Sequence, residues 1–239
     1  MTMKAALKLD PFKPSQYIYA PHDIRVGRSS EIVARYLGFS RSDAKIIGHA
    51  AALHDVGKLG ISNSIWQKPA PLTVEEWGAV KRHPEIGANW LNGCSSPVRR
   101  LARSIALTHH ERWDGTGYPL GLSGHKIPVV GRITMLVDQY DALRSARSYK
   151  AAFTHLQACR IILEGDDRTR PVHFDPQLLD LFRRFHQDFN SVFKSFHKRS
   201  PTLSAITPLS IVLSEDGDSD AGPERPSSGD GLHLLGTPS

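Results

Sequence analysis

The sequence predicts an all-α protein with a single folded domain. Apolar residues recur at helical spacing behind residues that cap helix N-termini, and the apolar–polar alternation typical of strands is nearly absent. A long glycine-rich connection, ERWDGTGYPLGLSGHKIP, joins two of the predicted helices. Connections of this length without regular structure are often functional, so this loop is a candidate part of a site.

The N-terminal half contains two signals for the start of a helix. Ser40 with Asp43 resembles a capping box, and the apolar spacing behind it continues to His54. Thr73 with Glu76 is a second such box and predicts the start of another helix.

Three further helices are predicted in the C-terminal half. Apolar residues at 101–107 predict a helix that runs to His109, and those at 133–140 predict another. The Asp-Pro pair at 175–176 combines an N-cap with proline at the first helical position, and the apolar spacing continues to Phe185.

Composition divides the chain into three parts. Residues 1–18 form a lead segment, 19–199 the folded domain, and 200–239 an acidic, low-complexity tail that is predicted to be disordered. The whole chain carries +6, but the tail holds six acids against one base, so residues 1–199 carry +11. A basic domain favours an anionic partner such as a nucleotide, although solubility alone would also explain the charge.

Other bulk features exclude some classes of protein. The chain has no apolar run long enough to span a membrane and no signal peptide, so a cytoplasmic protein without a membrane contact is expected. Two cysteines, Cys94 and Cys159, cannot form a disulfide framework and are expected to be packing residues.

Histidines and aspartates gather in or beside the predicted helices. Imidazole and carboxylate groups suit Fe, Mn, Ni or Zn, and one aspartate can bridge two such ions. Each residue alone would more commonly be a surface or core residue, and convergence requires several helices to pack around one centre. The candidates are His22, His54, Asp55, His83, His109, His110 and Asp138.

The motifs HHERWDGTGYPLGL and HDVGK resemble the HD-GYP family, a branch of the HD-domain phosphohydrolases that degrades cyclic di-GMP. The resemblance runs from about Tyr19 to Phe185 and includes HDIRV, KRHPEIG, GRITMLVDQYDAL and RSYK. It implies a single HD-domain helical bundle with a glycine-rich GYP loop. It also implies metal-dependent hydrolysis of cyclic di-GMP to linear pGpG, with further hydrolysis to GMP left open.

The resemblance also assigns residues to two metal ions. One ion would be held by His22, His54 and Asp138, with Asp55 as the bridge to the second. The ligands of the second ion would be His83, His109 and His110. Fe or Mn is the expected metal, with Ni and Zn as alternatives. The native ion is left open, because cells choose among these metals by availability.

The same resemblance assigns catalytic and substrate-binding roles. Asp55 and Lys58 would be catalytic, with Lys58 near the scissile phosphate and a hydroxide bridging the two ions as the nucleophile. The expected contacts to the dinucleotide are Lys58, Tyr118, Asp141, Arg147 and Lys150.

One position departs from the family pattern. Members with a third metal have a glutamate four residues before the first histidine, and this chain has Ile18 there. An isoleucine cannot bind a cation, so two ions are predicted. The seven histidines outside the motifs are assigned no chemistry: His49, His125, His155, His173, His186, His197 and His233.

Two other functions remain open at this stage. The domain could hydrolyse another nucleotide, or it could be a non-catalytic module that senses a cyclic dinucleotide and recruits proteins. Signalling proteins are candidate partners, and no nucleic-acid polymer is expected to bind. The oligomeric state is left open, with a dimer as one option.

Overall fold

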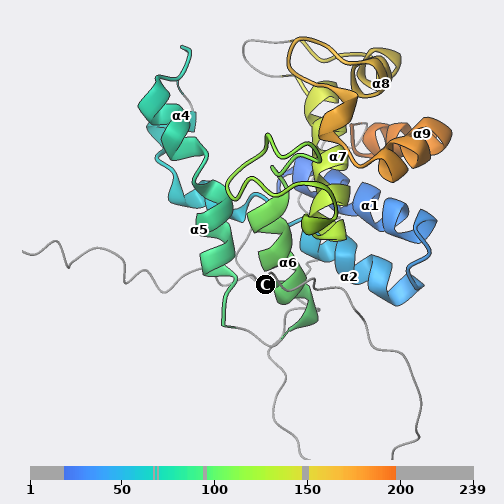
Figure 1. Cartoon of the computed structure of the whole chain (residues 1–239), viewed down its shortest axis with the longest axis horizontal. Helices are drawn as coiled ribbons and strands as arrows, with labels where there is room; N and C mark the ends of the chain where they lie inside the picture. The colour runs from blue at the N-terminus through green and yellow to red at the C-terminus, as the bar shows by residue number, and fades with distance from the viewer. Residues whose placement is uncertain (1–18, 67, 69, 94–95, 147–150, 198–239) are drawn as a thin grey trace, which may run out of the picture.

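The computed structural model describes residues 19–66, 68, 70–93, 96–146 and 151–197. Within these ranges the protein is helical and contains no strand, which confirms the predicted all-α class (Figure 1). The elements are α1 (Pro21–Tyr36), α2 (Arg41–Ala51), η2 (Val56–Gly60), α3 (Asn63–Trp66), α4 (Val74–Val80), α5 (His83–Trp90), α6 (Pro97–Thr108), η3 (Gly124–Lys126), α7 (Val129–Arg144), α8 (His155–Glu164), η4 (Pro171–His173) and α9 (Pro176–His197).

The predicted helix starts are confirmed. The Ser40 hydroxyl accepts a hydrogen bond from the Asp43 backbone N–H at the start of α2. At α4 the box is reciprocal, because Thr73 Oγ1 accepts from the Glu76 N–H and the Glu76 carboxylate accepts from the Thr73 N–H. The Asp175 carboxylate accepts from the Gln177 N–H at the start of α9.

One predicted boundary is wrong. The helix expected to reach His54 ends at Ala51. The chain then continues as a tighter turn, in which a backbone N–H donates to the carbonyl three residues earlier, as His54 does to Ala51. This tight turn leads directly into η2. It therefore places His54 and Asp55 in a bend between two helical segments.

The core is one cluster to which most helices contribute. Its fully or nearly fully buried members include Val26 of α1, Ile47 of α2, Ile105 of α6, Ile133 of α7 and Phe182 of α9. α1 packs on α2, α7 and α9, and α6 packs on α2, α5 and α7. In Figure 1, α8 and α9 lie together at one end of α7, and α4 and α5 lie on the opposite side of the molecule.

Several predictions concern residues outside the described ranges. These are the lead segment 1–18 with Ile18, the substrate contacts Arg147 and Lys150, and the acidic tail 200–239. Among the described helices, none has the length and apolar character needed to cross a membrane.

Candidate metal centre

All seven residues predicted to bind metal lie around one centre, and each comes from a helix or from the turn next to one. His22 and Asp138 lie within α1 and α7, and His83 is the first residue of α5. The remaining four lie in the turns that follow α2 and α6: His54, Asp55, His109 and His110. The centre therefore depends on the mutual packing of five helices.

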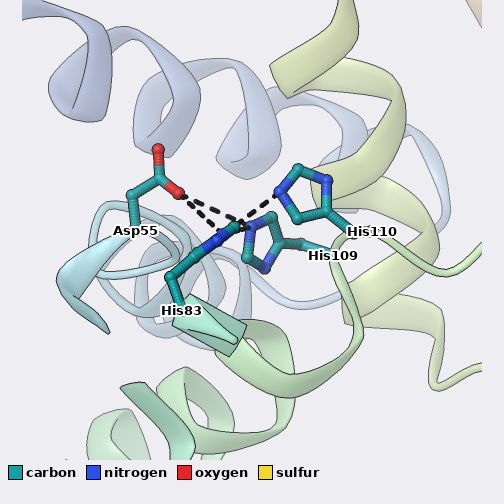
Figure 2. Close-up of side chains that lie close together, drawn as sticks. All are labelled: Asp55, His83, His109 and His110. Carbon is teal, nitrogen blue, oxygen red and sulfur yellow. Dashed lines mark hydrogen bonds and ion pairs between the residues drawn. The ribbon is translucent and has the colours of Figure 1, made fainter. Parts of the chain in front are cut away.

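Asp55 lies between two groups of histidines, and its two carboxylate oxygens face different groups. Oδ1 is 3.3 Å from His83 Nε2 and 3.6 Å from His109 Nε2 (Figure 2). Oδ2 is 3.2 Å from His54 Nε2. One carboxylate is thus shared by both groups, which is the geometry of a bridging ligand.

The three remaining predicted ligands, His110, His22 and Asp138, each lie beside one of these two groups of histidines. On one side His110 Nε2 lies 3.2 Å from His83 Nε2 (Figure 2). On the other side His22 Nε2 lies 3.2 Å from Asp138 Oδ1, and the same oxygen is 3.8 Å from His54 Nε2. The two halves match the two ligand sets that the resemblance implied.

Backbone carbonyls orient three of the imidazole rings. Nδ1 of His54 is 2.9 Å from the Ala51 carbonyl oxygen, and Nδ1 of His83 is 2.7 Å from that of Val80. Nδ1 of His109 contacts the carbonyls of the last turn of α6 at 3.0 and 3.1 Å. Protonation at Nδ1 leaves the Nε2 lone pairs directed at the centre, as in metal-binding histidines generally.

Asp141 orients His22 in a similar way. Its Oδ2 is 2.7 Å from His22 Nδ1, and both of its oxygens accept hydrogen bonds from the Arg25 guanidinium at 2.6 and 2.7 Å. Asp141 is only 3% exposed. This placement differs from the predicted contact with the dinucleotide, because the carboxylate is buried beneath His22 and is occupied by protein groups.

The electrostatics of the centre differ between its two groups of histidines. Burial lowers the pKa of His109, and burial together with the neighbouring His109 lowers that of His110, so both imidazoles are neutral at pH 7. Although burial opposes ionisation, His54 and Lys58 hold the pKa of Asp55 well below its usual range. Against the effect of burial, Asp138 and Asp141 raise the pKa of His22 to about 10, and Asp55 and Asp138 raise the pKa of His54. A divalent cation bound at the centre would therefore displace protons from these two imidazoles.

Two buried atoms of the centre have no hydrogen-bond partner among the described residues. They are His54 Nε2 and Asp55 Oδ1. Leaving a buried polar atom unpaired costs about 1–3 kcal/mol. Both atoms face the centre, and a divalent cation bound there would satisfy them, so the residues present fit a pair of metal ions.

Lys58 lies at the edge of the centre. Its ammonium group pairs with Asp55 Oδ2 and lies over the indole ring of Trp66, 5.2 Å from the ring centroid. The Asp55 charge raises the pKa of Lys58 against the effect of burial, so the group stays protonated. The side chain is 39% exposed and can therefore reach a bound anion.

The GYP loop is held against the centre by a buried carboxylate and a glycine. Glu111 is 1% exposed, and its carboxylate accepts hydrogen bonds from the backbone N–H groups of Leu120 and Leu122 at 2.6 and 2.9 Å. A Cβ on Gly117 would lie 2.3 Å from the Arg112 backbone nitrogen, so only glycine fits there. The loop thereby places the Tyr118 ring in a stack on His110, with centroids 4.7 Å apart.

Sequence reasoning missed the roles of two residues in this site. Arg25 lies in the HDIRV motif and Glu111 in HHERW, but neither was assigned a function. The signal available for a functional role was the charge of each residue inside a recognised motif. It was insufficient because a charge in such a motif is more often solvated than buried.

Comparisons with known proteins agree with this arrangement. A family model described as HD domain matches residues 14–178. The chain is 46% identical over 158 residues to a protein named cyclic di-GMP phosphodiesterase from Vibrio cholerae, a match that covers 64% of this chain and 31% of that protein. It is 39% identical over 176 residues to the cyclic di-GMP phosphodiesterase response regulator RpfG of Xanthomonas campestris, covering 74% and 46%.

Two further comparisons concern substrate and fold. A Vibrio cholerae protein named 3'3'-cGAMP-specific phosphodiesterase 2 is 39% identical over 171 residues, covering 72% of this chain and 32% of that protein. The solved structure of Bd1817, described as an HDG"Y"P protein from Bdellovibrio bacteriovorus, has the same fold, with a TM-score of 0.53 and 20% identity over 72% of this chain and 51% of that one.

The chain spans less than half the length of these three curated relatives. Its HD-domain match nevertheless covers most of the described structure, and the motifs that resemble HD-GYP proteins surround the centre just described. The chain belongs to the HD-domain family, in its HD-GYP branch.

Proposed function

We propose that this protein is a phosphodiesterase with two metal ions that hydrolyses cyclic di-GMP to linear pGpG. The observation that carries the proposal is the shared carboxylate of Asp55, whose Oδ1 faces His83 and His109 while Oδ2 faces His54. Two divalent cations held next to each other in this way would supply a water molecule of lowered pKa and a positive charge at the phosphate.

The protein's own residues perform the remaining tasks. Lys58 donates hydrogen bonds to the phosphoryl oxygens and stabilises the charge that develops on them during hydrolysis. Tyr118, which stacks on His110, borders the centre from the GYP loop and contacts the dinucleotide. Arg147 and Lys150 remain proposed substrate contacts on sequence grounds alone.

We propose a positioning role for Asp141 in place of substrate contact. A buried carboxylate that accepts hydrogen bonds from Arg25 and contacts His22 Nδ1 fixes the orientation of the His22 ring. Such partners of metal-binding histidines commonly change metal affinity by about 10–100-fold when mutated.

The identity of the metal is part of the proposal. Imidazole and carboxylate ligands without thiolate suit Fe and Mn as well as Ni and Zn. We favour Fe or Mn because the bridging carboxylate and Asp138 supply hard oxygen ligands to the first ion.

Two alternatives follow from particular observations. Hydrolysis of a mixed dinucleotide is supported by the name of the 3'3'-cGAMP-specific relative. A non-catalytic sensing module, or one that recruits signalling proteins, would use the same residues of the centre without turnover. The intact ligand set at the centre favours catalysis over the second alternative.

The deciding experiment is a chromatographic product assay on protein purified without oxygen and loaded with Fe²⁺ or Mn²⁺. Cyclic di-GMP, 3'3'-cGAMP and a mixture of the two are incubated with the wild type and with Asp55→Asn. We expect pGpG from cyclic di-GMP at a higher kcat/KM than product from 3'3'-cGAMP, and no product with the variant. The reverse preference would support the mixed dinucleotide, and tight binding without turnover would support the sensor.

A further inference from the structure

A second group of potential metal ligands lies between α8 and α9 and shares no residue with the centre described above. It consists of His155 and Cys159 of α8 and His186 of α9, which we call the α8–α9 cluster. Each residue offers one ligand atom, and the three atoms lie within 4.8 Å of one another. None of the three belongs to a motif that resembles the HD-GYP family.

We propose that the α8–α9 cluster binds one transition-metal ion of the Zn²⁺ class through His155 Nε2, His186 Nδ1 and the Cys159 thiolate. The bound ion would link the first turns of α8 to the middle of α9. This proposal is independent of the catalytic activity and requires no substrate.

The spacing of the three atoms is close to that of a zinc site. Zn–N bonds of about 2.0–2.1 Å and Zn–S bonds of about 2.3 Å place tetrahedral ligands about 3.4 Å (N to N) and 3.6 Å (N to S) apart. His155 Nε2 is 3.7 Å from Cys159 Sγ and 2.8 Å from His186 Nδ1. Metal binding therefore requires the two nitrogens to separate by about 0.6 Å, which a small rotation of one ring provides.

Local structure brings the ligands to one face. His155 and Cys159 are four residues apart on α8, so their side chains are neighbours on the helix surface. His186 directly follows Phe185, where α9 is interrupted by non-helical angles (φ −122°, ψ 17°). The Phe185 ring stacks on Tyr36 of α1 with centroids 3.9 Å apart, so the chain just before His186 is fixed against α1.

The other nitrogen of His155 has the kind of partner found behind metal-binding histidines. Nδ1 lies 2.8 Å from the hydroxyl oxygen of Tyr140, which also accepts a hydrogen bond from Arg144 Nη1 at 2.8 Å. With a cation bound at Nε2, the proton of His155 would lie on Nδ1 and would donate to the remaining lone pair of that oxygen. In this tautomer the Nε2 lone pair would bind the cation once His186 Nδ1, now 2.8 Å away, separates from it.

Protonation of His155 does not compete with metal binding near neutral pH. Burial, with contributions from His186, Arg144 and Lys194, lowers the pKa of His155 to about 4. Burial raises the pKa of the Cys159 thiol to about 11, so the metal must displace that proton to solvent. The resulting thiolate offsets part of the positive charge that the ion adds beside Arg144 and Lys194.

The mixed nitrogen and sulfur ligands also set the class of ion. Thiolate with imidazole selects Zn²⁺ and its spectroscopic substitute Co²⁺ over Mg²⁺, Ca²⁺ or Mn²⁺. Together with the two ions proposed for the catalytic centre, the cluster raises the expected number of metal ions per chain from two to three.

The test uses the thiolate as a signature, because the catalytic centre contains only nitrogen and oxygen ligands. The full chain is titrated with Co²⁺, and the near-ultraviolet band of sulfur-to-cobalt charge transfer is recorded. We expect the band in the wild type and in Cys94→Ser, the matched cysteine control, and its loss in Cys159→Ser. A wild type without the band, or a band that survives in Cys159→Ser, would overturn the proposal.

A second measurement guards against misfolded variants. Circular dichroism checks the helix content of Cys159→Ser and of His186→Ala, and elemental analysis counts zinc after equilibration and desalting. We expect each variant to bind one zinc ion fewer than Cys94→Ser. Equal zinc content in all three variants would mean that the cluster is a hydrogen-bonded histidine pair beside a buried thiol.

Discussion

The carboxylate of Asp55 shows how one side chain can determine the chemistry of a site. It is ionised despite burial, one oxygen has no hydrogen-bond partner among the described residues, and each oxygen faces a different group of histidines. A neutral amide of the same shape would keep the packing but could not neutralise two cations.

The first prediction follows from this charge. Asp55→Asn should lose at least one of the two ions of the centre and all measurable hydrolysis, with helix content unchanged. Elemental analysis and circular dichroism on the purified variant test this. Turnover at wild-type metal content would contradict the assignment of Asp55 as the bridge.

Lys58 illustrates a different role for a charge in the same turn. Its ammonium group is partly exposed and remains protonated, so it can stabilise charge that develops on a phosphoryl group. Lys58→Ala should therefore lower kcat by about 10²-fold with a smaller effect on KM. Lys45→Ala, which removes an exposed lysine of α2, is the control and should leave both constants unchanged. An increase confined to KM would assign Lys58 to binding alone.

Asp141 permits a sharp distinction between positioning and substrate contact. Asp141→Asn weakens the support of His22, so the affinity of the centre for metal should fall by about 10–100-fold. Once the centre is saturated with metal, KM should be near that of the wild type. Thermal unfolding is followed in parallel, because Arg25 loses its ionic partner. A raised KM with unchanged metal affinity would restore the predicted contact with the dinucleotide.

At the scale of elements, the approach of η2 to α5 sets the distance between Asp55 and His83. A Cβ on Gly57 would lie 2.0 Å from the His83 carbonyl oxygen and 2.5 Å from the Gly87 backbone nitrogen. These are backbone atoms, so the two segments cannot make room without moving apart. The glycine is therefore required by the close packing of η2, which directly follows Asp55, against α5, which begins at His83.

The substitution Gly57→Ala tests this packing. It should lower the free energy of unfolding by about 1–3 kcal/mol or more and weaken metal binding, because His83 would move away from Asp55. Gly78→Ala in α4 is the matched control, since a Cβ there meets nothing within 4 Å. The control should be neutral or stabilising by up to about 1 kcal/mol. Equal effects of the two substitutions, measured by denaturant unfolding, would contradict the packing argument.

At the scale of the whole molecule, the described helices already form a continuous core. The buried cluster extends from Tyr19 to Phe189, and all seven proposed metal ligands lie within that range. The tail from 200 onward is polar and strongly acidic, a composition that cannot contribute much apolar surface to a core.

Deletion of the tail is therefore expected to be tolerated. A chain that ends at Arg199 should keep the melting temperature and the metal content of the full chain. Calorimetry and elemental analysis on both proteins provide the comparison. Aggregation of the shorter chain, or loss of metal from it, would show that the tail contributes to the fold.

Sequence patterns were sufficient to predict the helical class, the starts of α2, α4 and α9, and the types of ligand. Caps such as Thr73 with Glu76 act through local hydrogen bonds, and the motif around His109 identifies the family without reference to packing. Tertiary structure decided the contacts between residues that are distant in the chain. His22 and Asp141 are 119 positions apart, and only the packing of α1 on α7 joins them and buries the carboxylate.

The same reason explains the α8–α9 cluster. Cys159 and His155 are helical neighbours that sequence spacing could have paired, but His186 joins them only because α9 packs on α8. The spacing of apolar residues and the capping residues indicate which segments are helical and where a helix begins or ends. The choice of partner across the core depends on how helices pack, which the sequence of any one element does not specify.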